Sequence, residues 1–299
     1  MVEHLSFLFF LCLISIPILL FAETNDNNAP PSEGNFALSS SQQPGAFLSF
    51  GQTLIGKNAL QLAVASFSPY HINMGPFNNL NAMLTYGITD DMSLYANFPL
   101  SADSHVRGHA FHGLSSGLQD VSLQLEKAFY TTDNRHYQDQ ATLVGAVTLP
   151  MQDADMRYES KGYGTLSYFL GTTFTRTYVD WLGFFSPGML LTQPKNNIRL
   201  GSQLLYQAGI GRTLLAIKDQ SDLFVLVEID GQYTYKNEVL GHSSPNSGGN
   251  VIALTPSLAL ISPHVMTQVG VGFPIVQQLY GMQKHMDFFI AAQLTWSIN

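Results

Sequence analysis

The sequence predicts an all-β fold, a transmembrane antiparallel β-barrel of about twelve strands that follows a cleaved N-terminal signal peptide. Apolar and polar residues alternate along many short segments, as in TYGITDDMSLYANFPL at 85–100, where Leu94 and Phe98 alternate with Ser93 and Asn97. A period of two is the side-chain period of a β-strand. After residue 22, no apolar run approaches the ~18 residues that a membrane helix requires. We therefore expect the apolar face of each segment to contact lipid and the polar face to line a lumen.

The chain divides into three regions. Residues 1–22 are largely apolar, end in Ala22 and precede an abruptly polar stretch, which is the layout of a secretory signal peptide. An uncleaved membrane anchor is the alternative, because no Lys or Arg precedes the apolar block. Residues 23–58 begin with a stretch rich in Asn, Ser, Pro and Gln, so we expect this polar segment either to be disordered or to plug the lumen. Residues 59–299 are expected to form the outer-membrane β-barrel.

The connections between the expected strands differ in length according to their position. The twelve expected strands are 59–69, 79–88, 92–100, 118–130, 140–150, 165–178, 181–191, 202–215, 223–235, 251–261, 265–276 and 287–298. Connections after even-numbered strands are short, except for TTDNRHYQD after the fourth, and those after odd-numbered strands are long. An even strand number with short turns at one end is typical of bacterial outer-membrane barrels. We therefore expect the short turns to face the periplasm and the long loops the cell exterior.

Three cationic residues of the outward register lie close to the short turns, namely Lys127, Arg176 and Arg212. A charge at the membrane midplane costs about 2–4 kcal/mol, whereas a long side chain near the interface reaches the phospholipid head groups. Aromatic residues at the same depth are expected to form an interfacial girdle, namely Tyr86, Phe129, Tyr178, Trp181 and Trp296.

Several stretches resemble an outer-membrane channel family named for the MetA pathway of phenol degradation. In order along the chain, they are the hairpin that ends in Phe98-Pro99-Leu100, GLQDVSLQLEKAF (117–129), VGAVTLP (144–150), LTPSL (254–258) and VGVGFPI (269–275). The resemblance implies a β-barrel through which small, often aromatic, compounds pass.

The inward register supplies the candidate functional residues. They are polar or acidic on the fourth and ninth expected strands, with aromatic residues on other strands: Asp120, Gln124, Glu126, Glu228, Asp230, Gln232, Tyr95, Phe169 and Phe289. Apolar groups with a few polar ones suit a small amphipathic or aromatic solute. Because no Lys or Arg faces inward, we expect the lumen carboxylates to favour cations. The alternative is that these side chains only fill the interior of a closed barrel.

Composition argues against several classes of function. The chain has 13 Lys and Arg against 21 Asp and Glu, a net charge of −8, and therefore no basic surface for nucleic acid. Its one cysteine, Cys12, lies in the expected signal peptide, so no disulfide or thiolate chemistry is proposed. We expect a passive channel that is not an enzyme and needs no cofactor. Its expected partners are outer-membrane lipids, small-molecule solutes and the outer-membrane assembly machinery. The sequence is also compatible with a homo-oligomer.

Four alternatives remain open at this point. A surface barrel that does not transport, and whose long loops bind other molecules, would show the same pattern, and a secreted β-sandwich would share the strands. His242 and Ser244 are two residues apart, as in an outer-membrane phospholipase-like hydrolase, but the loop GHSSPNSGGN is too rich in Gly and Ser to fix a base beside a nucleophile. His105, His109 and His112 have spacings that a metal ion accepts, although loop histidines are usually just exposed.

Overall fold

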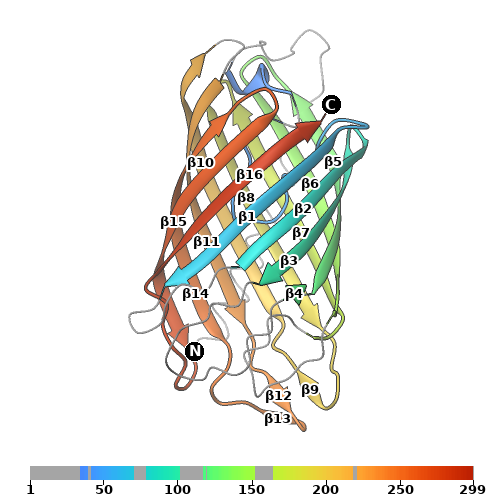
Figure 1. Cartoon of the computed structure of the whole chain (residues 1–299), viewed down its shortest axis with the longest axis vertical. Helices are drawn as coiled ribbons and strands as arrows, with labels where there is room; N and C mark the ends of the chain where they lie inside the picture. The colour runs from blue at the N-terminus through green and yellow to red at the C-terminus, as the bar shows by residue number, and fades with distance from the viewer. Residues whose placement is uncertain are drawn as a thin grey trace.

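A closed barrel of twelve long antiparallel strands makes up most of the protein (Figure 1). The computed structural model describes residues 34–39, 42–70, 79–101, 117–118, 120–151, 164–217 and 221–298. The wall strands are β1 (Leu60–Tyr70), β2 (Asn79–Thr89), β3 (Met92–Ser101), β5 (Val121–Asp133), β6 (Tyr137–Leu149), β7 (Ser167–Tyr178), β8 (Trp181–Thr192), β10 (Gln203–Ile217), β11 (Ser221–Thr234), β14 (Gly249–Ile261), β15 (Val265–Leu279) and β16 (Phe288–Ile298). Each pairs with its neighbours in sequence, and β1 also pairs with β16, which closes the sheet. The predicted fold class is confirmed.

One short strand, β4 (Gly117–Leu118), belongs to the wall sheet and pairs with the end of β3. The other short elements lie outside that sheet. They are the 3-10 helix η2 (Gly34–Phe36) and a small three-stranded sheet of β9 (Ile198–Arg199), β12 (Glu238–Val239) and β13 (His242–Ser243). Within the described ranges, no helix is long and apolar enough to cross a membrane.

Alternation along the strands sorts side chains between the two faces of the wall. Leu94 of β3 is 42 % exposed on the outside, whereas its neighbour Ser93 is fully buried. The same arrangement exposes large apolar side chains around the ring, among them Leu62, Leu143, Leu170, Ile210, Leu258 and Leu294. A closed barrel has no unpaired strand edge and can therefore lie in hydrocarbon. With this apolar outer face, the protein is an integral protein of the bacterial outer membrane.

The largest departure from the expected strands is the β5–β6 hairpin. The expected long connection is wrong, because β5 continues to Asp133 and β6 begins at Tyr137, with a turn at 134–136. The ladder shifts register at Phe129, and such a bulge interrupts the alternation on which a sequence pattern depends. Beyond the bulge, the Gln138 amide donates to the Asp133 carboxylate at 2.6 Å, so polar pairs continue the hairpin. With this hairpin, five connections are short, namely those of β2–β3, β5–β6, β7–β8, β10–β11 and β14–β15. They lie at one end of the barrel, called here the short-turn end, opposite the long-loop end.

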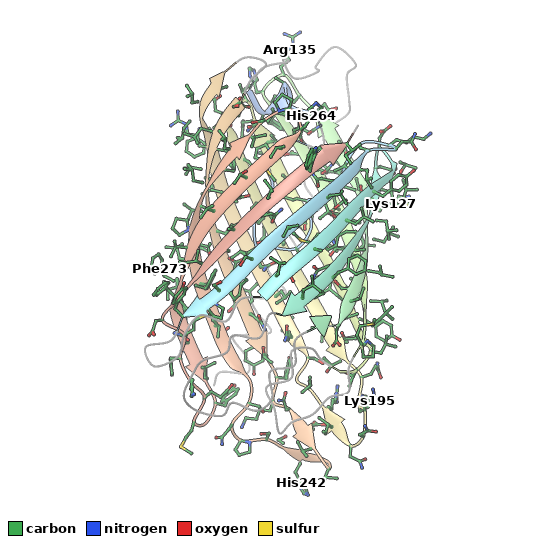
Figure 2. The ribbon with its side chains drawn as sticks, in the orientation of Figure 1. Lys127, Arg135, Lys195, His242, His264 and Phe273 are labelled. Atoms are coloured by element: carbon green, nitrogen blue, oxygen red, sulfur yellow. The ribbon has the colours of Figure 1, made fainter. Side chains whose placement is uncertain are left out.

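The two ends can be assigned to membrane sides by labelling. Arg135 and His242 lie at opposite ends of the barrel (Figure 2). We expect a cysteine that replaces His242 to react with a membrane-impermeant maleimide on intact cells. A cysteine that replaces Arg135 should react only after the outer membrane is breached, because outer-membrane barrels keep their short turns in the periplasm. Both variants would carry Cys12→Ser, and the opposite labelling pattern would show that the orientation is inverted.

Candidate functional site in the lumen

Residues 42–58, named here the luminal segment, run inside the barrel before β1 begins (Figure 1, blue). At its start, the Gln42 amide donates to the Ser262 carbonyl oxygen at 3.1 Å. At its end, the Lys57 N–H donates to the Asp90 carboxylate at 2.9 Å. Ser262 and Asp90 both lie in short turns, so the segment enters and leaves the lumen at the short-turn end.

Asn35 anchors the chain just before the luminal segment. It is fully buried, and its backbone N–H donates to the Val179 carbonyl oxygen at 2.8 Å in the β7–β8 turn. Its side-chain amide donates to the carbonyl oxygens of Tyr178 at 3.1 Å and Trp181 at 3.4 Å, and it accepts from the Thr213 hydroxyl at 2.8 Å. One side chain therefore ties this part of the chain to three wall strands.

The Glu228 carboxylate binds three consecutive backbone N–H groups of the luminal segment. Phe47 donates at 3.0 Å, Leu48 at 3.2 and 3.3 Å to the two oxygens, and Ser49 at 3.4 Å. Successive N–H groups that point at one centre form an anion-binding nest. Glu228 is 0 % exposed, so the nest replaces the water that the carboxylate loses on burial.

Glu126 binds the next turn of the luminal segment in the same way. Its carboxylate accepts from the backbone N–H groups of Gln52 at 2.9 Å and Thr53 at 2.8 Å. The hydroxyls of Thr53 and of Thr142, a neighbour on β6, each donate at 2.6 Å. Glu126 is also fully buried, and it has four donors around its two oxygens.

Backbone dipoles, and not cations, balance these two carboxylates. The luminal segment has no charged residue before Lys57. In the described parts of the chain, the ion pairs join Arg176 to Asp139 and Arg199 to Glu238, and neither involves Glu126 or Glu228. Hydrogen bonds to a charged group contribute about 1.5–3 kcal/mol each, more than neutral ones. The fit of the luminal segment therefore depends on the negative charge of the wall.

Between the two carboxylates, Phe50 packs on a floor of glycines. Its N–H donates to the Gln207 side chain at 3.0 Å, and its ring meets the Phe169 ring edge-on at 4.6 Å between centroids. A Cβ on Gly171 would lie 2.5 Å from the Phe50 ring, and one on Gly188 would lie 2.5 Å from the Phe169 ring. Glycine at these inward positions leaves the space that the two rings occupy.

A luminal chamber of about 440 Å³ lies beside the luminal segment. Its wall combines Phe47, Phe67, Met83, Tyr95 and Phe289 with Asn97, Gln207, Asp230, Gln232 and Gln293. The Phe67 and Phe289 rings are 4.7 Å apart, and Asp230 accepts from the Ser49 hydroxyl at 3.1 Å. The chamber therefore has aromatic surface together with hydrogen-bonding groups and one carboxylate.

The structure brings eight of the nine candidate residues to the luminal segment or the chamber. Gln124 donates to the Thr53 hydroxyl at 3.4 Å, and the contacts of the others are given above. Asp120 lies apart, directly before β5, where it accepts from the N–H groups of Met151 at 3.2 Å and Gly164 at 2.9 Å. Sequence reasoning missed Thr142 and Gln207, although both are polar residues of the inward register.

The alternative sites are only partly within the described residues. His105, His109 and His112, like the expected signal peptide, lie outside them. In the rest, no group of three His, Cys, Asp or Glu side chains could hold a metal ion. His242 and Ser243 form β13, with both side chains exposed at the long-loop end.

Comparison with solved structures gives outer-membrane barrels. The COG4313 outer membrane channel from Pseudomonas putida F1 aligns with a TM-score of 0.58 and 13 % identity over 85 % of this chain and 99 % of that one. LpxR from Salmonella typhimurium follows with a TM-score of 0.42 and 11 % identity, over 80 % and 99 % of the two chains. No family model and no curated protein matches the sequence. The first of these structures has the fold that the sequence predicts.

Proposed function

We propose that the protein is a passive outer-membrane channel for small amphipathic or aromatic molecules, with no cofactor and no catalytic residue. The observation that carries the proposal is the luminal chamber, because aromatic surface with a few polar groups is the usual lining of a small-molecule site. The resemblance to the phenol-degradation channel family and the similarity in fold to the COG4313 channel support the same function.

In this proposal the luminal segment is the gate. It crosses the lumen between Glu126 on β5 and Glu228 on β11, so its position obstructs a path along the barrel axis. Passage then requires the segment to leave both the nest at Glu228 and the contacts at Glu126. A gate held by hydrogen bonds to two side chains can open without unpairing any wall strand.

Planar-bilayer recording tests conduction. Deleting residues 44–55 is expected to change rare openings into a steady conductance, because the deletion removes the groups that Glu126 and Glu228 bind. Heat-dependent migration on a denaturing gel would establish that the shortened chain still forms a barrel. A folded deletion variant without conductance would support a surface barrel that does not transport.

The same recordings test selectivity. We expect the deletion variant to prefer cations, because Glu126, Glu228 and Asp230 then lose the luminal segment and face water. Asp120 adds a fourth carboxylate of the interior that has no cationic partner among the described residues. The preference should fade as salt rises from 0.1 to 1 M, where the Debye length falls from about 10 to about 3 Å. Replacing all four carboxylates by Asn or Gln in that background should abolish the preference. Anion preference, or a preference unchanged by the four substitutions, would show that other groups control passage.

A further inference from the structure

The outer surface of the barrel carries a groove of about 850 Å³ across β6, β7, β8 and β10, named here the outer groove. Its apolar lining includes Phe174, Tyr178, Trp181, Phe185 and Ile210. Phe174, Trp181 and Ile210 are all exposed on the outside of the wall, where the membrane lies. The outer groove is therefore separate from the lumen and opens toward lipid.

Gly183 forms the floor of the outer groove. It pairs with Arg176 on β7 and with Ile210 on β10, whose side chains point outward on either side of it. A Cβ built on Gly183 would meet only the Gly209 carbonyl oxygen, at 3.9 Å. Gly183 therefore leaves the floor of the outer groove free of side-chain atoms.

A cationic side chain, Arg212, lies beside the Trp181 end of the outer groove, at the depth of the short turns. Arg212 pairs with Trp181, the first residue of β8, and its guanidinium carbon lies 5.0 Å from the centre of the Trp181 ring. Arg176 donates to both carboxylate oxygens of Asp139 at 2.6 and 2.7 Å, so that pair is neutral. Arg212 has no carboxylate partner among the residues that the structure describes. It leaves a net positive charge where lipid head groups are expected.

We propose that the outer groove binds one phospholipid molecule, with an acyl chain over Gly183 and the phosphodiester at Arg212. The charge complements a phosphate, since a guanidinium presents a planar fork of donors that phosphate oxygens accept. The apolar side chains complement an acyl chain. Arg212 lies nearer the membrane interface and the apolar lining nearer the membrane interior, which is the order of the head group and the acyl chain in a phospholipid. This site is independent of whether the barrel conducts.

Native mass spectrometry of the full-length protein, titrated with phosphatidylglycerol in a mild detergent, tests the site. Gly183→Leu fills the outer groove and is expected to lower the affinity for the first phosphatidylglycerol by about tenfold, as expected when roughly two methylene groups lose apolar contact. Gly145→Leu is the matched control. Gly145 also faces outward, between the exposed Leu125 and Leu170, and a Cβ there meets nothing within 4 Å. That variant should bind as the wild type does.

Arg212→Gln separates the head group from the acyl chain. It is expected to weaken phosphatidylglycerol binding and to leave the binding of diacylglycerol, which has no phosphate, unchanged. Heat-dependent gel migration would confirm that each variant is folded. The proposal is overturned if the wild type binds no phosphatidylglycerol above background, if Gly183→Leu and Gly145→Leu bind it equally, or if Gly183→Leu instead abolishes a dimer, which would make the outer groove an interface between copies of the chain.

Discussion

Replacing Glu126 and Glu228 together by Gln is expected to open the channel. Each Gln keeps the volume of the carboxylate but removes its charge and turns an NH₂ group toward backbone N–H groups that need an acceptor. Losing about 1.5 kcal/mol at each site shifts the gate roughly tenfold per substitution. The open probability in planar bilayers should then rise on the order of a hundredfold in the double variant, because opening breaks the contacts at both carboxylates.

Asp120→Asn is the matched control for this prediction. Asp120 is also a buried acid of the barrel, but its carboxylate binds N–H groups of Met151 and Gly164 and none of the luminal segment. Its substitution is expected to leave the open probability unchanged. An equal rise in the control, or wild-type gating in the double variant, would show that loss of charge in general, or some other contact, sets the gate.

Phe224→Ala is expected to lower the free energy of unfolding by about 3–5 kcal/mol, the usual cost of a Phe-sized cavity in a packed core. The Phe224 side chain is 1 % exposed, and a Cβ on Gly211 would lie 2.1 Å from its ring. Phe224 belongs to a buried cluster with Phe47 of the luminal segment and with Leu182, Phe184, Leu226, Ala259, Ile261 and Ala291 of the wall. The measurement is urea unfolding in lipid vesicles.

Leu240→Ala controls for the loss of an apolar side chain in general. Leu240 lies in the β12–β13 hairpin at the long-loop end and is 71 % exposed. Its substitution is expected to change the unfolding free energy by less than about 0.5 kcal/mol. Similar losses in both variants would mean that the interior cluster does not hold the barrel together.

Alternation within single segments was sufficient to predict the wall. Each strand of a barrel contacts lipid on one face and the interior on the other, so its own residues record both environments. This is why Leu94 and Phe98 were assigned outward, and Ser93 and Asn97 inward, without knowledge of their partners in the ladder. The pattern failed where a residue was inserted, at the Phe129 bulge, because one extra residue reverses the faces that follow.

The luminal segment shows what sequence alone left open. Its composition allowed either disorder or a plug, because a segment without periodic alternation does not indicate which of its residues are buried. Phe47 and Glu228 are 181 positions apart in the chain, and the nest at Glu228 uses backbone N–H groups that every non-proline residue has. Asp120 and Glu126 are both acidic residues of the inward register of one expected strand, so the sequence does not distinguish them. In the structure, Asp120 binds the N–H group of Gly164, whereas Glu126 binds the luminal segment.

The sequence by itself determined the barrel, its strand number and, away from the Phe129 bulge, the faces of its strands, because these depend on period and turn spacing along the chain. Tertiary structure alone decided which carboxylates hold the luminal segment, where the luminal chamber lies, and that Gly183 stands between Arg176 and Ile210. Those features arise where strands distant in sequence come within a few ångströms of one another, and hydrogen bonds and packing act only over such distances.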